Sequence, residues 1–259
     1  MTTKKTIGMF GGGVLGGAMK KHFPEAKIYD KYHSADPLAE VKAQDVIFIC
    51  VPTPYTTGKG FDPTELDDVF SNLADLQDKI VVIRSTVLPG TTAEYQKKYP
   101  ALKILFNPEF LTEATSEQDF LHPDKQLVGY TPQSRAVAEE VLNLLPGAPY
   151  KKVLPSGEAE MVKYMVNCFY AVKVTFANQI YDICVAAGLN YETVKEAFAA
   201  DKRVVNQHLE IFHKGYRGFG GKCLRKDIYS LIDFAEKLKV DPALLKAAKE
   251  LNLKFNDNK

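Results

Sequence analysis

The stretch GMFGGGVLGGAMKKHF, residues 8–23, decides how the first half of this chain folds. It contains the spacing G-x-G-x-x-G at Gly11, Gly13 and Gly16, after an apolar strand pattern and before a helical one. Glycines in this arrangement allow a tight turn and let the backbone approach a pyrophosphate at the helix N-terminus. The stretch therefore predicts a strand, a dinucleotide-binding turn and a helix.

A second strand pattern, AKIYD at residues 26–30, ends in an acidic side chain. Asp30 lies near the usual offset for a carboxylate that binds the 2′-hydroxyl of a ribose. A carboxylate there disfavours a 2′-phosphate, so we expect NAD rather than NADP as the cofactor. The neighbouring Lys31 weakens that preference, because a cation favours a phosphate.

Around these two strands the first half alternates short apolar runs with amphipathic helical patterns. DVIFICV (45–51) and KIVVIRS (79–85) are typical runs, and PTELDDVFSNLADLQD (63–78) has the helical period. Strands that are apolar throughout and alternate with helices indicate a parallel sheet covered on both faces. We predict an α/β fold, with a Rossmann-like, doubly wound parallel sheet over residues 1–155.

The pattern changes at Ser156. Residues 156–188 contain no proline, their apolar positions recur at helical spacing, and Gly188 stands at the expected helix end. Further helical patterns follow, so we predict an all-helical domain over residues 156–259, broken only by a glycine-rich loop around Cys223. We expect a homodimer through the apolar segment 223–257 of this domain, which includes the stripe LLKAAKEL (244–251).

Composition and charge exclude several classes of protein. The chain is 46% hydrophobic and 25% charged with a net charge of +1, which gives no reason to expect nucleic acid or a membrane surface as a partner. No apolar run approaches the ~20 residues that span a bilayer, and the N-terminus lacks a signal-peptide pattern. The dispersed cysteines and histidines predict neither disulfides nor a metal site. We therefore expect a cytoplasmic protein.

One cysteine stands in an unusual setting. In GFGGKCLRKD (218–227), Cys223 follows a run of glycines and precedes Arg225, Lys226 and Asp227. A thiol beside cations on a glycine-loosened backbone is typical of a partly ionised nucleophile. Taken alone, the stretch supports a nucleophile only weakly, and the alternative is a glycine turn that carries an incidental cysteine.

Other polar residues stand where chemistry is common. Lys163 and Asn167 are four residues apart on the long predicted helix and so share a face, where they would stabilise an oxyanion or simply lie in solvent. Glu109 and Glu113 follow the strand pattern KILF, at the sheet edge that lines ligand crevices. They are either a general base with a supporting carboxylate or loop acids in water. Ser85 and Thr86, with the turn Pro89-Gly90, follow the preceding strand; their hydroxyls either contact a cofactor or cap the next helix.

Six motifs occur together in this chain. They are GGGVLGG (11–17), CVPTP (50–54), RSTVLPGTT (84–92), NPEFLTE (107–113), AEMVKYMVNCF (159–169) and GFGGKCLRKD (218–227). In this order, and over nearly the whole chain, they resemble the UDP-glucose/GDP-mannose dehydrogenase family.

The resemblance implies a four-electron oxidation of the 6-hydroxymethyl group of a nucleotide sugar to a carboxylate, using two NAD in turn. Cys223 would be the nucleophile that forms a thiohemiacetal and then a thioester. Lys163 and Asn167 match the pair that stabilises oxyanion character. Asp227 and Thr86 match residues that hold a water, and Glu109 matches the carboxylate assigned to thioester hydrolysis.

The resemblance also assigns binding residues. The cofactor contacts would be Gly11, Gly13, Val14, Leu15, Gly16, Asp30, Val51, Pro52, Thr53, Ser85, Thr86 and Glu113. The substrate contacts would be Glu109, Phe110, Leu111, Lys163, Asn167, Arg203, Phe219, Gly220, Gly221 and Cys223. Arg203 matches an arginine that reaches the substrate across a dimer interface. UDP-glucose is the default substrate, ahead of a UDP-N-acetylmannosamine-type sugar or GDP-mannose, and the implied role is supply of acidic sugars for surface polysaccharide.

The chain departs from the family pattern in two ways. Arg225 replaces a proline after the cysteine, where it would lower the pKa of Cys223, bind a phosphate or have no effect. The chain also ends near LNLKFNDNK, so we expect it to lack the domain that binds the UDP part of the substrate, unless another chain supplies that domain. Two alternatives remain: an NAD-binding dimeric scaffold without turnover, and a two-electron β-hydroxyacid-type dehydrogenase, which would leave the cysteine motif unexplained.

Overall fold

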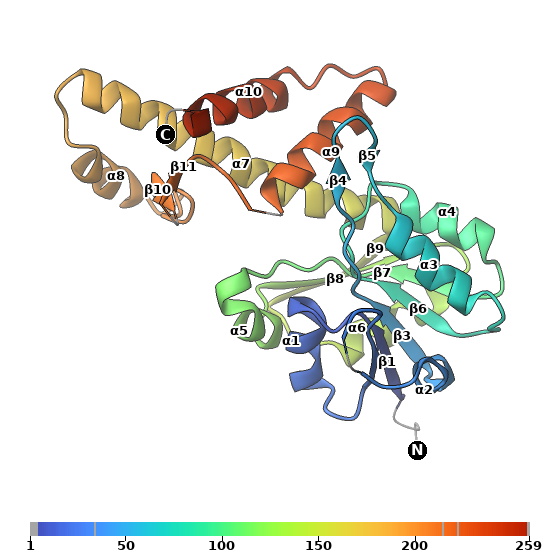
Figure 1. Ribbon diagram of the computed structural model, residues 1–259. Helices are drawn as coiled ribbons and strands as arrows, with labels where there is room; N and C mark the ends of the chain where they lie inside the picture. Colours follow the sequence, from blue (N-terminus) through green and yellow to red (C-terminus); the bar gives the residue numbers. More distant parts are fainter. Residues whose placement is uncertain (1–4, 34, 214, 222, 258–259) are drawn as a thin grey trace. The chain divides into compact units, whose positions relative to one another are not determined.

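The computed structural model describes residues 5–33, 35–213, 215–221 and 223–257 (Figure 1). The chain divides into two compact units. The sheet unit comprises Met1–Pro54 and Phe61–Lys163, and the helical unit comprises Tyr55–Gly60 and Tyr164–Lys259. Each unit is described by itself below.

A seven-stranded sheet forms the centre of the sheet unit. Its strand order is β2-β1-β3-β6-β7-β8-β9, so the chain leaves β1 toward β2 and returns to the other side at β3. Ligands bind at such a reversal, outside the carboxyl ends of the strands. The strands are β1 (Ile7–Phe10), β2 (Lys27–Tyr29), β3 (Val46–Ile49), β6 (Ile80–Ile83), β7 (Lys103–Phe106), β8 (Lys125–Tyr130) and β9 (Tyr150–Pro155).

Helices cover both faces of this sheet, as Figure 1 shows. Successive strand residues point to opposite faces, so Met9 joins one hydrophobic core and Phe10 the other. The first core packs against α1 (Val14–His22), α5 (Ser116–Leu121) and α6 (Ala138–Leu144). The second packs against α2 (Leu38–Ala43), α3 (Thr64–Leu73) and α4 (Thr91–Lys98). The predicted doubly wound, Rossmann-like α/β domain is confirmed.

One strand runs against the prediction of a parallel sheet. β8 pairs antiparallel with β7, with Phe106 opposite Gly129, whereas all other neighbours in the sheet are parallel over the described residues. An apolar strand buried on both faces has the same sequence pattern in either direction, so the direction of β8 could not be predicted.

The helical unit is built on α7 (Ser156–Ala186), whose first turns belong to the sheet unit. The helix ends where predicted, because Gly188 takes a φ of +69° and Leu189 N–H donates to the Cys184 carbonyl. The other helices are α8 (Tyr191–Ala199), α9 (Leu224–Lys237) and α10 (Ala243–Asp257). One core of this unit gathers α7, α9 and α10 around Ala171, Ile228 and Ala248.

Two short hairpins correct the prediction that the second region is helical apart from one loop. β10 (Phe212–His213) pairs antiparallel with β11 (Tyr216–Arg217) just before the glycine-rich loop. β4 (Tyr55–Thr56) and β5 (Gly60–Phe61) form a hairpin that lies in the first half of the sequence but contributes to the helical unit. Its residue Tyr55 packs edge-on against Tyr229 of α9. Strands of two residues carry too little periodicity to be predicted.

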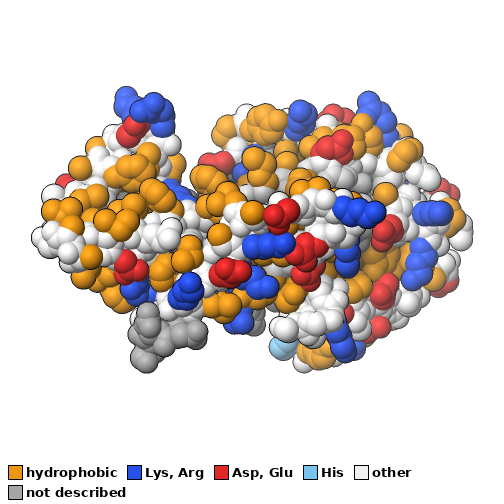
Figure 2. Space-filling view, turned by 90° about the horizontal axis from the view of Figure 1, so that it is seen from above, with side chains coloured by type: hydrophobic (Ala, Val, Ile, Leu, Met, Phe, Trp, Pro, Cys, Tyr) orange, Lys and Arg blue, Asp and Glu red, His pale blue; other side chains and the backbone are white. Residues whose placement is uncertain are grey.

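The surface carries charges of both signs. Acidic and basic side chains are interspersed on the face drawn in Figure 2. None of the helices in the described ranges is both long enough and apolar enough to cross a membrane.

Candidate active site

The glycine turn after β1 has the geometry that a dinucleotide needs. Gly11 takes a φ of +96°, and a Cβ there would lie 2.6 Å from the Cys50 carbonyl oxygen at the end of β3. A Cβ on Gly16 would lie 2.1 Å from the Gly11 carbonyl oxygen, so α1 can pack against the turn only if residue 16 is a glycine. A Cβ on Gly13 would meet nothing within 4 Å, which leaves the N-terminus of α1 open to a phosphate. The residues of this turn therefore fit the pyrophosphate of a dinucleotide.

Asp30 fastens this turn to the end of β2. Its Oδ2 accepts a hydrogen bond from Gly12 N–H at 2.7 Å, and its Oδ1 accepts from Tyr32 N–H at 2.9 Å. Burial alone would raise the pKa of Asp30, but the hydrogen bonds from Gly12 and Tyr32 lower it to about 2. Asp30 is therefore an ionised acceptor at neutral pH, as a ribose-binding carboxylate must be.

A cavity of about 300 Å³ opens beside Asp30 within the sheet unit. It lies at the reversal point of the sheet, between the carboxyl ends of the first strands and α3. Its volume is suitable for the adenosine half of a dinucleotide. The lining residues are Phe10, Gly11, Tyr29, Asp30, Lys31, Tyr32, Val51, Pro52, Glu65, Asp68, Val69, Ser71 and Asn72.

Hydroxyl groups tie the loops after β3 and β6 together. Ser85 Oγ donates to the Val51 carbonyl at 2.6 Å, and Thr53 Oγ1 donates to the Thr86 carbonyl at 2.7 Å. Ser85 thus makes an inter-loop contact rather than the helix cap that the sequence left open. Of the other residues expected at the cofactor, Val14 and Leu15 begin α1, and Glu113 begins the exposed turn η1 (Glu113–Thr115).

A partly buried acid–base pair lies after β7. Lys163 Nζ is 2.7 Å from Glu109 Oε1, and Leu111 N–H donates to Glu109 Oε2 at 2.8 Å. Lys163 is only 3% exposed. Burial acts to raise the pKa of Glu109, but the Lys163 ammonium lowers it below the ordinary value. Glu109 is thus ionised at neutral pH, which a general base requires.

Sequence reasoning missed a second lysine beside this pair. Lys125 Nζ lies 4.1 Å from the centre of the Phe110 ring, and Lys163 Nζ lies 5.6 Å from the same centre. Burial lowers the pKa of Lys125. Phe110 therefore presents its ring to two ammonium groups.

Glu160 was also missed, although it holds the loop that carries Ser85 and Thr86. It is buried, and its carboxylate accepts from Gly90 N–H at 2.6 Å and from Thr92 N–H at 2.8 Å. These N–H groups belong to the N-terminus of α4, which Glu160 caps from α7. Burial raises the pKa of Glu160 to about 7.

The helical unit gathers a second polar cluster at the start of α9. Asp227 is fully buried, accepts a hydrogen bond from Asn167 Nδ2 at 2.5 Å and is paired with Lys226. Cys223 is exposed and immediately precedes the helix, and Asp227 N–H donates to its carbonyl at 3.0 Å. The thiol-bearing residue and the buried carboxylate therefore stand one turn apart on α9.

The glycine-rich loop before Cys223 is fastened to α10. Asn252 Oδ1 accepts from Phe219 N–H at 2.6 Å, and Asn252 Nδ2 donates to the Phe219 carbonyl at 2.8 Å. A Cβ on Gly220 would lie 2.7 Å from the Tyr216 ring, and Gly221 takes a φ of +71°. Asn252 lies far from the loop in sequence, and no pattern in the sequence indicated it.

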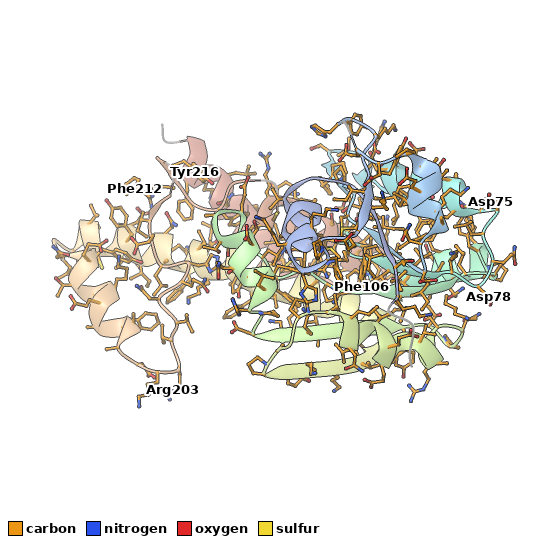
Figure 3. All side chains as sticks on the ribbon, turned by 90° about the horizontal axis from the view of Figure 1, so that it is seen from below. Asp75, Asp78, Phe106, Arg203, Phe212 and Tyr216 are labelled. Atoms are coloured by element: carbon orange, nitrogen blue, oxygen red, sulfur yellow. The ribbon has the colours of Figure 1, made fainter. Side chains whose placement is uncertain are left out.

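Two further cations from the sequence analysis contact neighbouring side chains at the surface. Arg203 is 89% exposed at its side chain and pairs with Asp201; Figure 3 shows it directed outward beyond α8. Arg225 is exposed and stacks over the Tyr229 ring at 5.7 Å.

Two family models match this chain. Residues 15–145 match the NAD binding domain of the UDP-glucose/GDP-mannose dehydrogenase family, and residues 157–254 match its central domain. The chain belongs to the UDP-glucose/GDP-mannose dehydrogenase family. The predicted family and the predicted cofactor, NAD, are both confirmed by these matches.

Individual relatives agree with this family. The chain is 32% identical over 225 residues to a UDP-glucose 6-dehydrogenase of Rickettsia conorii, covering 82% of this chain and 50% of that protein. It resembles a solved UDP-glucose dehydrogenase of Pyrobaculum islandicum with a TM-score of 0.84 and 26% identity, over 98% of this chain and 69% of that one. A GDP-mannose dehydrogenase of Pseudomonas aeruginosa gives a TM-score of 0.66 at 26% identity, over 96% and 68%.

The matched region makes up most of this chain but a smaller share of its relatives. The chain spans about half the length of the curated relatives that it matches. The UDP-glucose/GDP-mannose dehydrogenase models nevertheless account for both the sheet unit and the helical unit.

Proposed function

We propose that this chain is the NAD-binding and catalytic part of a nucleotide-sugar dehydrogenase that oxidises a 6-hydroxymethyl group to a carboxylate. UDP-glucose is the proposed substrate, because the Rickettsia conorii and Pyrobaculum islandicum relatives are UDP-glucose dehydrogenases by name. The observation that carries the proposal is the cluster on α9, where exposed Cys223 stands one turn before buried Asp227.

The proposed reaction consumes one water and transfers four electrons. Bound NAD supplies a hydride acceptor in each of two oxidations. The first oxidation removes a hydride from C6 and a proton from the hydroxyl group, which leaves an aldehyde. The Cys223 thiolate then forms a bond to the aldehyde carbon, and the resulting oxyanion takes up a proton to give the thiohemiacetal.

A second loss of hydride and proton converts the thiohemiacetal into a thioester on Cys223. Water attacks the thioester carbon, the carbon–sulfur bond breaks, and the acid and the thiol are released. The net reaction converts an alcohol, water and two NAD into a carboxylate, two NADH and three protons.

The residues of each unit are suited to parts of this chemistry. In the sheet unit, ionised Glu109 is the proposed base for the water, Lys163 is a cationic donor for oxyanions, and the Thr86 hydroxyl is a proposed water ligand. In the helical unit, Asn167 donates one amide hydrogen to Asp227, and its second amide hydrogen is the proposed oxyanion donor. Asp227, in turn, is positioned by Asn167 and Lys226.

The other predicted contacts remain part of this proposal. Phe110, Leu111 and the loop Phe219–Gly221 would bind the sugar. Arg203 would reach the substrate of a second copy, since its side chain is exposed.

Measuring NADH with a panel of UDP- and GDP-sugars tests the proposal. We expect two NADH per sugar, and a loss of at least about 10³-fold in turnover for Cys223→Ala. The matched control is Cys184→Ala, which removes a buried thiol from the same unit and should retain turnover. One NADH per substrate, unaffected by Cys223→Ala, would instead support the two-electron dehydrogenase. Binding of NAD without turnover of any sugar would support the scaffold.

We also propose that the helical unit forms a homodimer, but through a different surface from the one expected. Part of the apolar stripe of α10 is used internally, because Ala248 is buried in the core with α7 and α9. On α7, by contrast, Met165 and Phe169 are 70% and 62% exposed, and Phe176 and Ile183 continue the series at intervals of seven residues. Such a stripe on one helix face is typical of a contact between helices.

A further inference from the structure

Lys31 occupies the position where a cation should change the choice of cofactor. It directly follows Asp30, and both residues line the cavity in the sheet unit. An available ammonium group there would attract the 2′-phosphate of NADP through charge-assisted hydrogen bonds. The chain nevertheless carries an NAD binding domain. The surroundings of Lys31 explain why the two observations are compatible.

Two carboxylates of α3 hold Lys31. Its Nζ is 2.8 Å from Asp68 Oδ2 and 3.7 Å from Glu65 Oε1. The hydrogen bond that Lys31 donates to Asp68 raises the pKa of Lys31, so the ammonium stays charged and directed at α3. Glu65 also accepts a hydrogen bond from the Tyr32 hydroxyl at 2.6 Å. Both residues that follow Asp30 are therefore fixed to α3.

The resulting wall of the cavity is acidic. Asp30, Glu65 and Asp68 carry three negative charges and Lys31 carries one positive charge, which gives −3 + 1 = −2. His33, whose ring lies 3.0 Å from Asp30, is largely exposed. The 2′-phosphate of NADP, which is a dianion, would therefore be repelled by the net negative charge of this wall.

The lysines on the other side of Asp30 are also engaged. Lys20, which lines a smaller cavity beside Asp30, donates to the Ala26 carbonyl at 2.5 Å. Lys27 pairs with Glu40 at 2.7 Å and with Asp36 at 3.4 Å. Lys31 is therefore the cation whose release would change the cavity most.

We propose that Glu65 and Asp68 determine cofactor selectivity, because they hold Lys31 away from the 2′ position and so preserve the exclusion of NADP by Asp30. In this arrangement Asp30 would bind the ribose hydroxyl of NAD, and the carboxylates of α3 neutralise the cation that would otherwise oppose it. The inference rests on the NAD site and not on the proposed sugar oxidation. Binding of the two cofactors tests it without turnover.

Titration calorimetry of the full chain with NAD and NADP, without sugar, is the test. The variants are Asp30→Ser, the pair Glu65→Gln/Asp68→Asn, and all three changes together. We expect Asp30→Ser alone to weaken NAD about tenfold and leave NADP weak, because Lys31 is still held by α3. We expect the triple variant to bind NADP about 10–100-fold more tightly than Asp30→Ser does, through the released ammonium. Adding Lys31→Met should abolish that gain.

The matched control removes two carboxylates that contact other residues. Asp67 accepts from the Tyr95 hydroxyl and Asp75 pairs with Lys42, so Asp67→Asn/Asp75→Asn changes the net charge equally without touching Lys31. This control should leave the ratio of NAD to NADP affinity within about twofold, since Asp67 and Asp75 do not line the cavity and their charges are screened by salt. Asp75 lies at one edge of the sheet unit in Figure 3.

Three results would overturn the inference. One is unchanged NADP binding when Glu65→Gln/Asp68→Asn is added to Asp30→Ser in a chain that still binds NAD. The second is an equal gain from the Asp67/Asp75 control, which would make the effect one of net charge. The third needs no change in α3: a gain of about tenfold or more in NADP affinity from Asp30→Ser alone would mean that α3 does not hold Lys31.

Discussion

The two units of this chain differ in how much of their apolar surface they leave exposed. In the sheet unit, the central strands β1, β3 and β6 are buried at every position, and helices cover both faces of the sheet. In the helical unit, α7 leaves Met165 and Phe169 largely exposed, while its cores are smaller. The sheet unit thus completes its own core, whereas the helical unit leaves apolar side chains of α7 exposed, where we propose that a second chain packs.

The units also differ in how they hold the side chains for which we propose catalytic roles. In the sheet unit Glu109 forms an ion pair with Lys163, so the charge of its carboxylate is neutralised by one neighbouring side chain. Asp227 in the helical unit is held by Asn167 and Lys226, and exposed Cys223 stands one turn away. The sheet unit therefore provides a carboxylate paired with a lysine, and the helical unit provides an exposed cysteine one turn before a buried carboxylate.

The largest expected effect tests the difference between the two cores. Phe106→Ala removes a ring that is 0% exposed in the sheet core, and we expect it to lower the free energy of unfolding by about 3–5 kcal/mol. The matched substitution in the helical unit is Phe212→Ala, at a residue that is 63% exposed. We expect a loss of about 1 kcal/mol or less there. Figure 3 labels both residues. Urea titrations that follow each unit separately would measure the two losses.

Equal losses from these two substitutions would contradict the comparison. In that case Phe212 would contribute as much to stability as a core residue, and the helical unit would be as tightly packed as the sheet unit.

The next effect concerns Glu160, which α7 contributes to the sheet unit. Burial raises its pKa from 4.5 to about 7 in the folded chain. Between these values the folded state binds more protons than the unfolded state, so this group stabilises the fold at low pH and loses that contribution as the pH rises through about 7. The expected change is about 2–3 kcal/mol.

Glu160→Gln should remove this pH dependence. We would compare the free energy of unfolding of wild type and variant at about pH 5 and about pH 8. The control is Glu158→Gln, an exposed position on the same helix, which should keep the wild-type dependence. If the stability of the Glu160→Gln variant and that of the wild type changed in parallel with pH, the assignment to Glu160 would be wrong.

The sequence predicted those features that depend on local backbone geometry. Gly11, Gly13 and Gly16 were predicted because a positive φ and a close backbone approach can be met only by glycine, and the structure needs glycine at Gly11 and Gly16 for those reasons. The long helix α7 was predicted because its apolar period is sustained over many turns. Both signals lie within a single segment.

Features that depend on pairing between segments were missed. Lys125 begins β8, which was expected to run parallel to β7, and a parallel strand would start at the edge opposite Phe110. Because β8 is antiparallel, with Phe106 opposite Gly129, its first residue instead lies beside Phe110. Lys31 illustrates the same limit: its effect on cofactor choice depends on α3, which lies more than thirty residues away in sequence.

The smallest expected effect on stability comes from the exposed stripe of α7. It tests most directly whether the helical unit, unlike the sheet unit, leaves apolar surface for a second chain. Phe169→Ser should leave unfolding nearly unchanged, because the ring is already in solvent, but weaken the proposed homodimer about tenfold. Sedimentation over a range of concentrations would measure the dissociation constant. Leu244→Ser on α10 is the matched control, since Leu244 is equally exposed but lies outside the stripe. A wild-type chain that stays monomeric at micromolar concentrations would contradict the homodimer. A dimer weakened by Leu244→Ser and not by Phe169→Ser would return the contact to α10, where the sequence alone had placed it.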